Sequence, residues 1–206
     1  MEREFFLESI EKRIESKPLG TVFVTSDFID ITSSETANRA LLRLEQDGKI
    51  RRVLRGVYER PEYSEFLNEY VAPSPDKVAR ALARNFGWRI VPSGDTALNM
   101  LGLSTQVPST WVYVSDGPYR KYQYDQVTLH FKRTAQKELT DISDKTALVI
   151  QALKAIGKKS VTKEVIYKIS SLLSKKEKQD MLNEAQYTTA WIYELIKEIA
   201  AHEVSK

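Results

Sequence analysis

The apolar pattern of the chain changes period at Gly48, and this change restricts how the N-terminal part can fold. Ahead of it, apolar residues recur at helical spacing in three short segments between residues 3 and 47. Behind it, β-branched and aromatic residues surround Gly56 in residues 49–58, as expected of a two-stranded hairpin. Three helices followed by a hairpin indicate a winged helix-turn-helix over residues 1–60.

The three helices are expected at residues 3–16, 26–31 and 34–47. Proline and glycine end the first helix, and a short extended stretch follows it. Either Ser26 or Asp27 can cap the second helix. That helix would carry the apolar side chains Phe28, Ile29 and Ile31.

The third helix is expected to have two different faces. One stripe is apolar and should lie in the core: Ala37, Ala40, Leu41 and Leu44. The opposite side is polar: Thr36, Asn38, Arg39 and Arg43. In a winged helix this helix enters the major groove of DNA. There Arg39 has the chemistry to read guanine and Asn38 to read adenine, while Arg43 would meet phosphate.

Positive charge is concentrated on the elements that would dock. Residues 1–35 hold four basic and eight acidic side chains, whereas residues 36–60 hold seven basic and three acidic ones. The hairpin is expected to grip phosphates in a salt-sensitive way through Lys49, Arg51, Arg52 and Arg55. The predicted partner is duplex DNA, with two copies of the chain meeting inverted repeats. The alternative is a winged helix that binds only protein.

The rest of the chain is expected to form a connector at residues 61–75, with a short helical element, and a second domain at residues 76–206. In that domain strands are expected at 88–91, 111–114 and 127–131, with helices at 77–85 and 97–101. A helical tail follows, with helices at 145–156, 162–173, 175–184 and 188–203. The fold class is therefore α+β: a winged helix-turn-helix, then a mixed domain with a helical tail.

Three stretches of the sequence resemble the AbiEi-type antitoxins of abortive-infection toxin–antitoxin systems. They are KIRRVLRGVY at 49–58, PSGDTALNMLGLSTQVP at 92–108 and YVSDGP at 113–118. The resemblance covers residues 24–157 and leaves out the helical tail from Ser160 onward. It implies an antitoxin that represses its own operon by binding promoter DNA, as part of phage defence. It also implies that the C-terminal domain counteracts a nucleotidyltransferase-like toxin, in a type IV system that needs no stable complex between the two proteins.

The residues give little support to catalysis. The two histidines are His130, expected in a strand, and His202, near the C-terminus. The sequence has no cysteine, no His/Asp/Glu cluster with metal-ligand spacing and no phosphate-binding glycine loop. We predict a protein that is not an enzyme and holds no metal or cofactor. A nuclease is the weakest alternative, because no acidic pair followed by Glu-x-Lys is present.

A second candidate contact surface lies in the C-terminal domain, where residues 119–124 interleave aromatic and basic side chains. Such residues can stack on bases and meet phosphate, so a nucleic acid or the toxin could bind there. The candidate residues are Tyr119, Arg120, Lys121, Tyr122, Tyr124, Lys132 and Arg133. The alternative is an exposed hairpin in which tyrosines pair across strands and lysines protect an edge.

The N-terminal segment is too acidic, and its apolar run too short, for a signal peptide. No stretch approaches the length of a membrane span. We expect a cytoplasmic protein without membrane contact. The functional alternative to an antitoxin is a stand-alone winged-helix regulator with a C-terminal sensor or protein-interaction domain.

Overall fold

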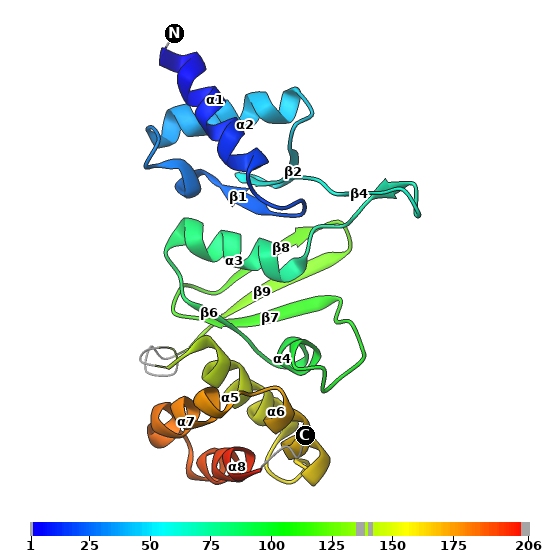
Figure 1. The fold of residues 1–206 in the computed structure, drawn as a ribbon, viewed down its shortest axis with the longest axis vertical. Coiled ribbons are helices and arrows are strands. Elements are labelled where there is room, and N and C mark those ends of the chain that lie inside the picture. Colours follow the sequence, from blue (N-terminus) through cyan, green and yellow to red (C-terminus); the bar gives the residue numbers. More distant parts are fainter. Residues whose placement is uncertain (1, 135–138, 140–141, 203–206) are drawn as a thin grey trace. The chain divides into compact units, whose positions relative to one another are not determined.

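The computed structural model describes residues 2–134, 139 and 142–202. The chain forms two compact units, Met1–Trp88 and Arg89–Lys206 (Figure 1). Helices and strands occur in both units, and the fold class is α+β, as predicted.

The N-terminal unit begins as a winged helix-turn-helix. Its elements are α1 (Glu2–Glu15), β1 (Val22–Val24), the 3₁₀ turn η1 (Thr25–Phe28), α2 (Ser34–Gln46), β2 (Arg51–Leu54) and β3 (Val57–Glu59). The strands form an antiparallel sheet in the order β1-β3-β2, so β1 closes the sheet beside the wing hairpin β2–β3. The element order and this sheet agree with the predicted fold of residues 1–60.

Helix α2 forms where its cap and its apolar stripe predict it. The Ser33 hydroxyl accepts a hydrogen bond from the Thr36 N–H at 3.3 Å, which caps the N-terminus. After the C-terminus, Gly48 adopts a left-handed φ of 72° that few other residues tolerate. The predicted stripe is buried with residues of α1, β1 and η1 in one core: Ala37, Ala40, Leu41, Leu44, Ile10, Ile14, Phe23 and Phe28.

The second helix is shorter than predicted. Residues 26–31 do not form an α-helix, because only the single 3₁₀ turn η1 is present and Ile29 is 62% exposed. The N–H groups of Ile31 and Thr32 both bond to the carbonyl of Phe28, which turns the chain directly toward the Ser33 cap. The cap of η1 is the Asp27 carboxylate, which accepts from the Val24 N–H at 2.9 Å.

The segment predicted as a connector with a helical element is instead a second hairpin. Its strands are β4 (Tyr63–Ser64) and β5 (Glu69–Tyr70). The rings of Tyr63 and Tyr70 meet edge to face at 5.3 Å, and Asn68 has a φ of 52°. A cross-strand aromatic pair and a left-handed residue at the turn both favour a hairpin over a helix.

The boundary between the two units lies at Trp88, not within residues 61–75 as predicted. Helix α3 (Pro75–Phe86) belongs to the N-terminal unit and packs on β1 and η1. Its Arg84 donates to the Val22 carbonyl at 3.1 Å, and its Lys77 donates to the Gly20 carbonyl at 2.9 Å. These partners lie far back along the chain, so local sequence patterns gave no sign of them.

The C-terminal unit opens with a mixed four-stranded sheet. Its strands are β6 (Ile90–Pro92), β7 (Thr110–Ser115), β8 (Arg120–Tyr124) and β9 (Val127–Arg133), in the order β6-β7-β9-β8. The central pair β7 and β9 is parallel, and the two outer pairings are antiparallel. Helix α4 (Asp95–Met100) connects β6 to β7. The predicted strands and this helix are confirmed, with small changes of bounds.

Four helices complete the described part of the C-terminal unit, as the pattern predicted. They are α5 (Asp144–Ile156), α6 (Lys163–Ser171), α7 (Lys175–Glu184) and α8 (Ala190–Ala201), with a 3₁₀ turn η3 (Ala185–Tyr187) before α8 (Figure 1). Their apolar faces share one core that includes Leu153, Ile169, Met181 and Ile196. Among the described residues, no helix is both long and apolar enough to cross a membrane.

Candidate nucleic-acid interface

The exposed face of α2 carries the side chains predicted to read DNA. Asn38, Arg39 and Arg43 all lie on this face, opposite the buried stripe. Arg39 pairs with Glu35, one helical turn earlier, at 2.5 Å. Both side chains are mostly exposed, so this ion pair contributes little and can exchange for a stronger partner. The Arg43 guanidinium makes no hydrogen bond or ion pair with the described residues.

Leu42 also lies on this face, and sequence reasoning missed it. Its side chain is 43% exposed although its neighbour Leu41 is fully buried. An exposed leucine between two arginines can contact the methyl group of thymine in the major groove. The only sequence signal was its position, one residue out of the apolar stripe.

Two further residues hold α2 to the turn that precedes it. The Thr25 hydroxyl of η1 donates a hydrogen bond to Oδ1 of the Asn38 side chain, which orients the side-chain amide of Asn38. Thr36 is half-buried at the first turn of α2, where its hydroxyl accepts from the Ser33 hydroxyl at 3.1 Å. The side-chain oxygen of Asn38 is therefore engaged within the protein, and Thr36 takes part in the cap of α2.

The wing presents two free arginines. Arg52 lies on β2, and Arg55 lies in the two-residue turn before β3; both are exposed. Gly56 completes that turn with a φ of 74°, which permits the tight reversal. Neither guanidinium makes a hydrogen bond or ion pair within the described part of the chain. Arg52 and Arg55 are thus available for phosphate.

Arg51 was predicted as a phosphate contact, and the structure gives it a different role. Its guanidinium bonds to the Glu59 carboxylate at 2.6 Å and to the Val71 carbonyl at 2.8 Å. Glu59 is only 2% exposed, so Arg51 supplies the countercharge for a buried carboxylate. The same guanidinium lies 5.7 Å from the ring centroid of Tyr70. Arg51 fixes the wing and the second hairpin and is not free to bind DNA.

Lys49 is likewise engaged within the protein. Its ammonium group donates to the Glu11 carboxylate, and Glu15 lies 3.9 Å away. The hydrogen bond with Glu11 is the main cause that raises the pKa of Lys49. The acidic face of α1 therefore neutralises Lys49. Among the candidate residues of α2 and the wing, four exposed arginines remain for DNA: Arg39, Arg43, Arg52 and Arg55.

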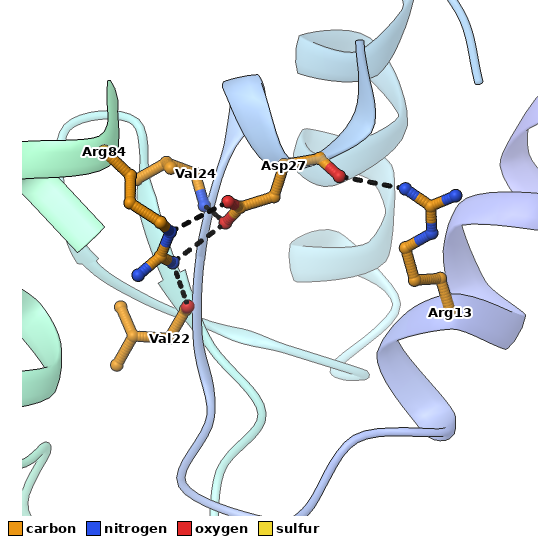
Figure 2. Close-up of polar contacts among 5 residues, drawn as sticks. All are labelled: Arg13, Val22, Val24, Asp27 and Arg84. Carbon is orange, nitrogen blue, oxygen red and sulfur yellow. Dashed lines mark hydrogen bonds and ion pairs between the residues drawn. The ribbon is translucent and has the colours of Figure 1, made fainter. Parts of the chain in front are cut away.

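A network of ion pairs positions η1, and local sequence patterns did not reveal it. The Asp27 carboxylate accepts two hydrogen bonds from Arg84, at 3.0 and 3.1 Å, as well as the Val24 N–H (Figure 2). Arg13 reaches η1 from α1, donating to the Asp27 carbonyl at 3.0 Å and pairing with Asp30 at 2.7 Å. The hydrogen bond with Arg13 is the main cause that lowers the pKa of Asp30. The turn next to α2 is thus held from both sides.

A family model described as "Family of unknown function (DUF6088)" matches residues 9–181, most of the chain, and extends over parts of both units. The chain belongs to this family. No curated protein matches the chain.

In this DUF6088 chain, the second candidate surface is divided between the two faces of the sheet. Tyr119, Lys121 and Lys132 lie on one face with His130, since Lys121 pairs directly with His130. The remaining candidates lie on the opposite face: Arg120, Tyr122, Tyr124 and Arg133. Tyr124 is buried, and Tyr122 packs edge to face on Phe131 at 5.9 Å. Burial removes Tyr124 from the candidate surface, whereas Tyr122 is half-buried and its contact with a ligand stays a prediction.

His130, on β9 of this DUF6088 chain, makes no hydrogen bond or ion pair with a carboxylate of the described residues. His130 bonds to the Tyr119 hydroxyl. Partial burial is the largest cause that lowers its pKa, followed by the charges of Lys132 and Lys121. Within the described residues, no group of three or more His, Asp or Glu side chains could hold a metal ion.

Proposed function

We propose that this protein is a DNA-binding transcriptional repressor that acts on its own promoter. One observation carries the proposal. Among the residues whose side chains the structure describes, four arginines of the N-terminal unit are exposed and open to a new partner, and they lie on α2 and on the wing, the two elements with which a winged helix docks on DNA. Other cations of the same segment are paired internally, as Lys49 and Arg51 are.

We further propose that the protein is the antitoxin of a toxin–antitoxin system. The resemblance to AbiEi-type antitoxins supports this, and the resembling stretches include the wing and much of the β6–β7 region. In this account the N-terminal unit represses the operon, and the C-terminal unit counteracts a nucleotidyltransferase-like toxin, with no stable complex required. The protein would work in the cytoplasm, where its promoter and toxin are found, and it would not be an enzyme.

A reporter gene behind the chain's own upstream DNA tests the repressor. The variant Arg52→Glu/Arg55→Glu should lose repression, because reversed charge repels phosphate and neither side chain supports the fold. The matched control is Lys158→Glu/Lys159→Glu, which reverses two exposed charges in the C-terminal unit and should repress normally. Equal repression by both folded variants would contradict the proposal.

Co-expression with the neighbouring gene of the operon tests the antitoxin. The Arg52→Glu/Arg55→Glu variant, expressed from an independent promoter, should still protect cells from the neighbouring toxin. The antitoxin role would be contradicted if the neighbouring gene is not toxic, or if the unaltered chain does not protect cells from it. The protein would then be a regulator without an antitoxin role.

A further inference from the structure

One face of the neighbouring strands β8 and β9 brings together cationic and aromatic side chains (Figure 1). The register places Lys121 of β8 directly opposite His130 of β9, and Lys132 follows His130 two residues later on the same face. The ring of Tyr119, the residue before β8, meets the His130 ring edge to face with 4.7 Å between the centroids. These four side chains are here called the His130 face.

The His130 face is an uncovered part of its side of the sheet. On β7, Val114 lies on the same side as its partner Lys132 and packs in an apolar cluster with Ala147 of α5. On β8 and β9, by contrast, Lys121 and Lys132 are exposed, and Tyr119 is 63% exposed. Helix α5 therefore covers the apolar part of this side, and the cationic part is open to a ligand.

The lysines of the His130 face have no counterion within the described part of the chain. Neither Lys121 nor Lys132 makes a hydrogen bond or an ion pair with a described residue. Both lie close enough to His130 for their charges to lower its pKa, in addition to the larger effect of partial burial. Like charges on neighbouring positions of a sheet repel one another, and a bound anion would relieve this repulsion. The arrangement therefore favours an anionic ligand.

Protection of a sheet edge does not explain these cations. In the strand order β6-β7-β9-β8, β8 is at the edge, and a lysine such as Lys121 suits an edge strand. His130 and Lys132 lie on β9, which has a neighbouring strand on both sides. A lysine on an inner strand protects no edge, so Lys132 needs another explanation.

The side chains of the His130 face are of the kinds that bind single-stranded nucleic acids. An exposed tyrosine ring can stack on an unpaired base, and lysines beside it can bind the phosphates of the same strand. The bases of a duplex stack on one another instead and do not offer their faces to a flat sheet. On the same face the Gln123 amide donates to the Thr128 hydroxyl at 3.3 Å, which adds polar groups beside the ring and the cations.

We propose that the His130 face binds single-stranded nucleic acid, with a base stacked on Tyr119 and phosphates at Lys121 and Lys132. This site belongs to the C-terminal unit and is distinct from α2 and the wing, which are proposed to bind promoter duplex. It does not rest on the proposed function, because it requires neither a promoter sequence nor a toxin. RNA and single-stranded DNA share the bases and phosphates that it would bind, so the test uses both.

Fluorescence anisotropy with labelled oligouridylate and oligothymidylate of about ten nucleotides provides the first test. The full chain carries Arg52→Glu/Arg55→Glu throughout, so that the wing does not hold the oligonucleotide. In this background the chain should bind at low salt, and the oligonucleotide that binds more tightly identifies the preferred sugar. Adding Lys121→Glu/Lys132→Glu should weaken binding at least about tenfold, because two phosphate contacts become repulsive.

The matched control is Lys158→Glu/Lys159→Glu, which reverses two exposed charges elsewhere in the C-terminal unit. In the same background it should bind the oligonucleotides as the background chain does. Absence of binding to both oligonucleotides, or equal weakening by the two pairs of substitutions, would overturn the proposal. Neither result depends on whether the chain represses its promoter.

A second test separates base stacking from simple attraction of charge. Tyr119→Leu should weaken binding about fivefold or more, whereas Tyr119→Phe keeps the ring and should bind normally. Tyr187→Leu, at a tyrosine that is 97% exposed, is the control and should have no effect. An oligoglutamate peptide of equal charge should not displace the oligonucleotide, because it has no base to stack. Normal binding by Tyr119→Leu, or displacement by the peptide, would show that the face attracts any anion, acidic protein included, and would overturn the proposal.

Discussion

The exposed arginines of α2 differ in their immediate surroundings, and this difference predicts different roles. Arg39 is paired with Glu35, whereas Arg43 lies one turn later without an ion-pair partner among the described residues. Arg39→Ala should weaken binding to the preferred site by about 1–3 kcal/mol and relax the preference at one base pair. Binding to a panel of single base-pair variants measures this.

Arg43→Ala should act differently, because a phosphate contact carries no sequence information. It should weaken binding to all sequences alike and make the salt dependence shallower by about one contact. Circular dichroism should show both variants folded. If Arg39→Ala weakens preferred and random DNA by the same factor, then Arg39 is also a phosphate contact.

Arg51 and Arg52 are neighbours with the same side chain, yet we predict opposite effects for their removal. Arg51→Ala leaves the Glu59 carboxylate buried without its countercharge, which should lower the free energy of unfolding by about 3 kcal/mol. Adding Glu59→Gln should recover part of that loss. Arg52→Ala should leave the free energy of unfolding unchanged and weaken DNA binding. Chemical denaturation of the three variants tests this, and equal stability of Arg51→Ala and Arg52→Ala would refute the assignment.

The basic residues of the wing show which properties of the site could be predicted from the sequence and which could not. The run of basic residues after Gly48 located the wing correctly. The sequence could not show which of these cations are paired within the protein. The partner of Lys49, Glu11, lies 38 residues earlier, and the partner of Arg51, Glu59, is buried only when the whole sheet has formed. Arg39, Arg43, Arg52 and Arg55 lie on exposed surface, whereas Lys49, although exposed, is paired with Glu11, and Arg51 is paired with Glu59.

At the level of elements, the ion pairs of Asp27 predict how α3 is held. Arg84→Ala removes two hydrogen bonds to Asp27 and one to the Val22 carbonyl, so α3 should open more often from β1. Hydrogen exchange of the α3 amides should speed up, while that of α1 should not. In an Asp27→Asn background the same substitution should have a smaller effect. Unchanged exchange in α3 would show that apolar packing alone holds the helix.

Elements with strong local signals were predictable, and those fixed by distant contacts were not. Helix α2 has its cap, its stripe and its closing glycine within its own sequence. The turn η1 is held by Arg13 and Arg84, which lie 14 and 57 residues from Asp27. The β4–β5 hairpin was predicted to contain a helical element because Phe66, Leu67, Tyr70 and Val71 have the spacing of an apolar helix face, although Phe66 and Leu67 are exposed.

At the scale of the whole molecule, the position of the boundary predicts which fragments fold. A fragment of residues 1–88 should unfold cooperatively and retain DNA binding, because it includes α3. A fragment of residues 1–75 lacks Arg84 and Lys77 and exposes the surface of β1 that α3 covers, so it should be less stable or aggregate. Thermal unfolding of both fragments makes the comparison. If the two fragments are equally stable, α3 is not needed for the N-terminal unit and the boundary lies within residues 61–75.

The central claim is that α2 and the wing bind the chain's own promoter DNA, and an equilibrium titration across a salt series tests it most directly. Upstream DNA should bind with a dissociation constant below about 1 µM at moderate salt, more tightly than a scrambled duplex. Binding should weaken steeply with salt, and Arg52→Ala/Arg55→Ala should reduce the slope by about two phosphate contacts. Equal affinity for upstream and scrambled DNA, or a salt slope that the double variant leaves unchanged, would contradict the account.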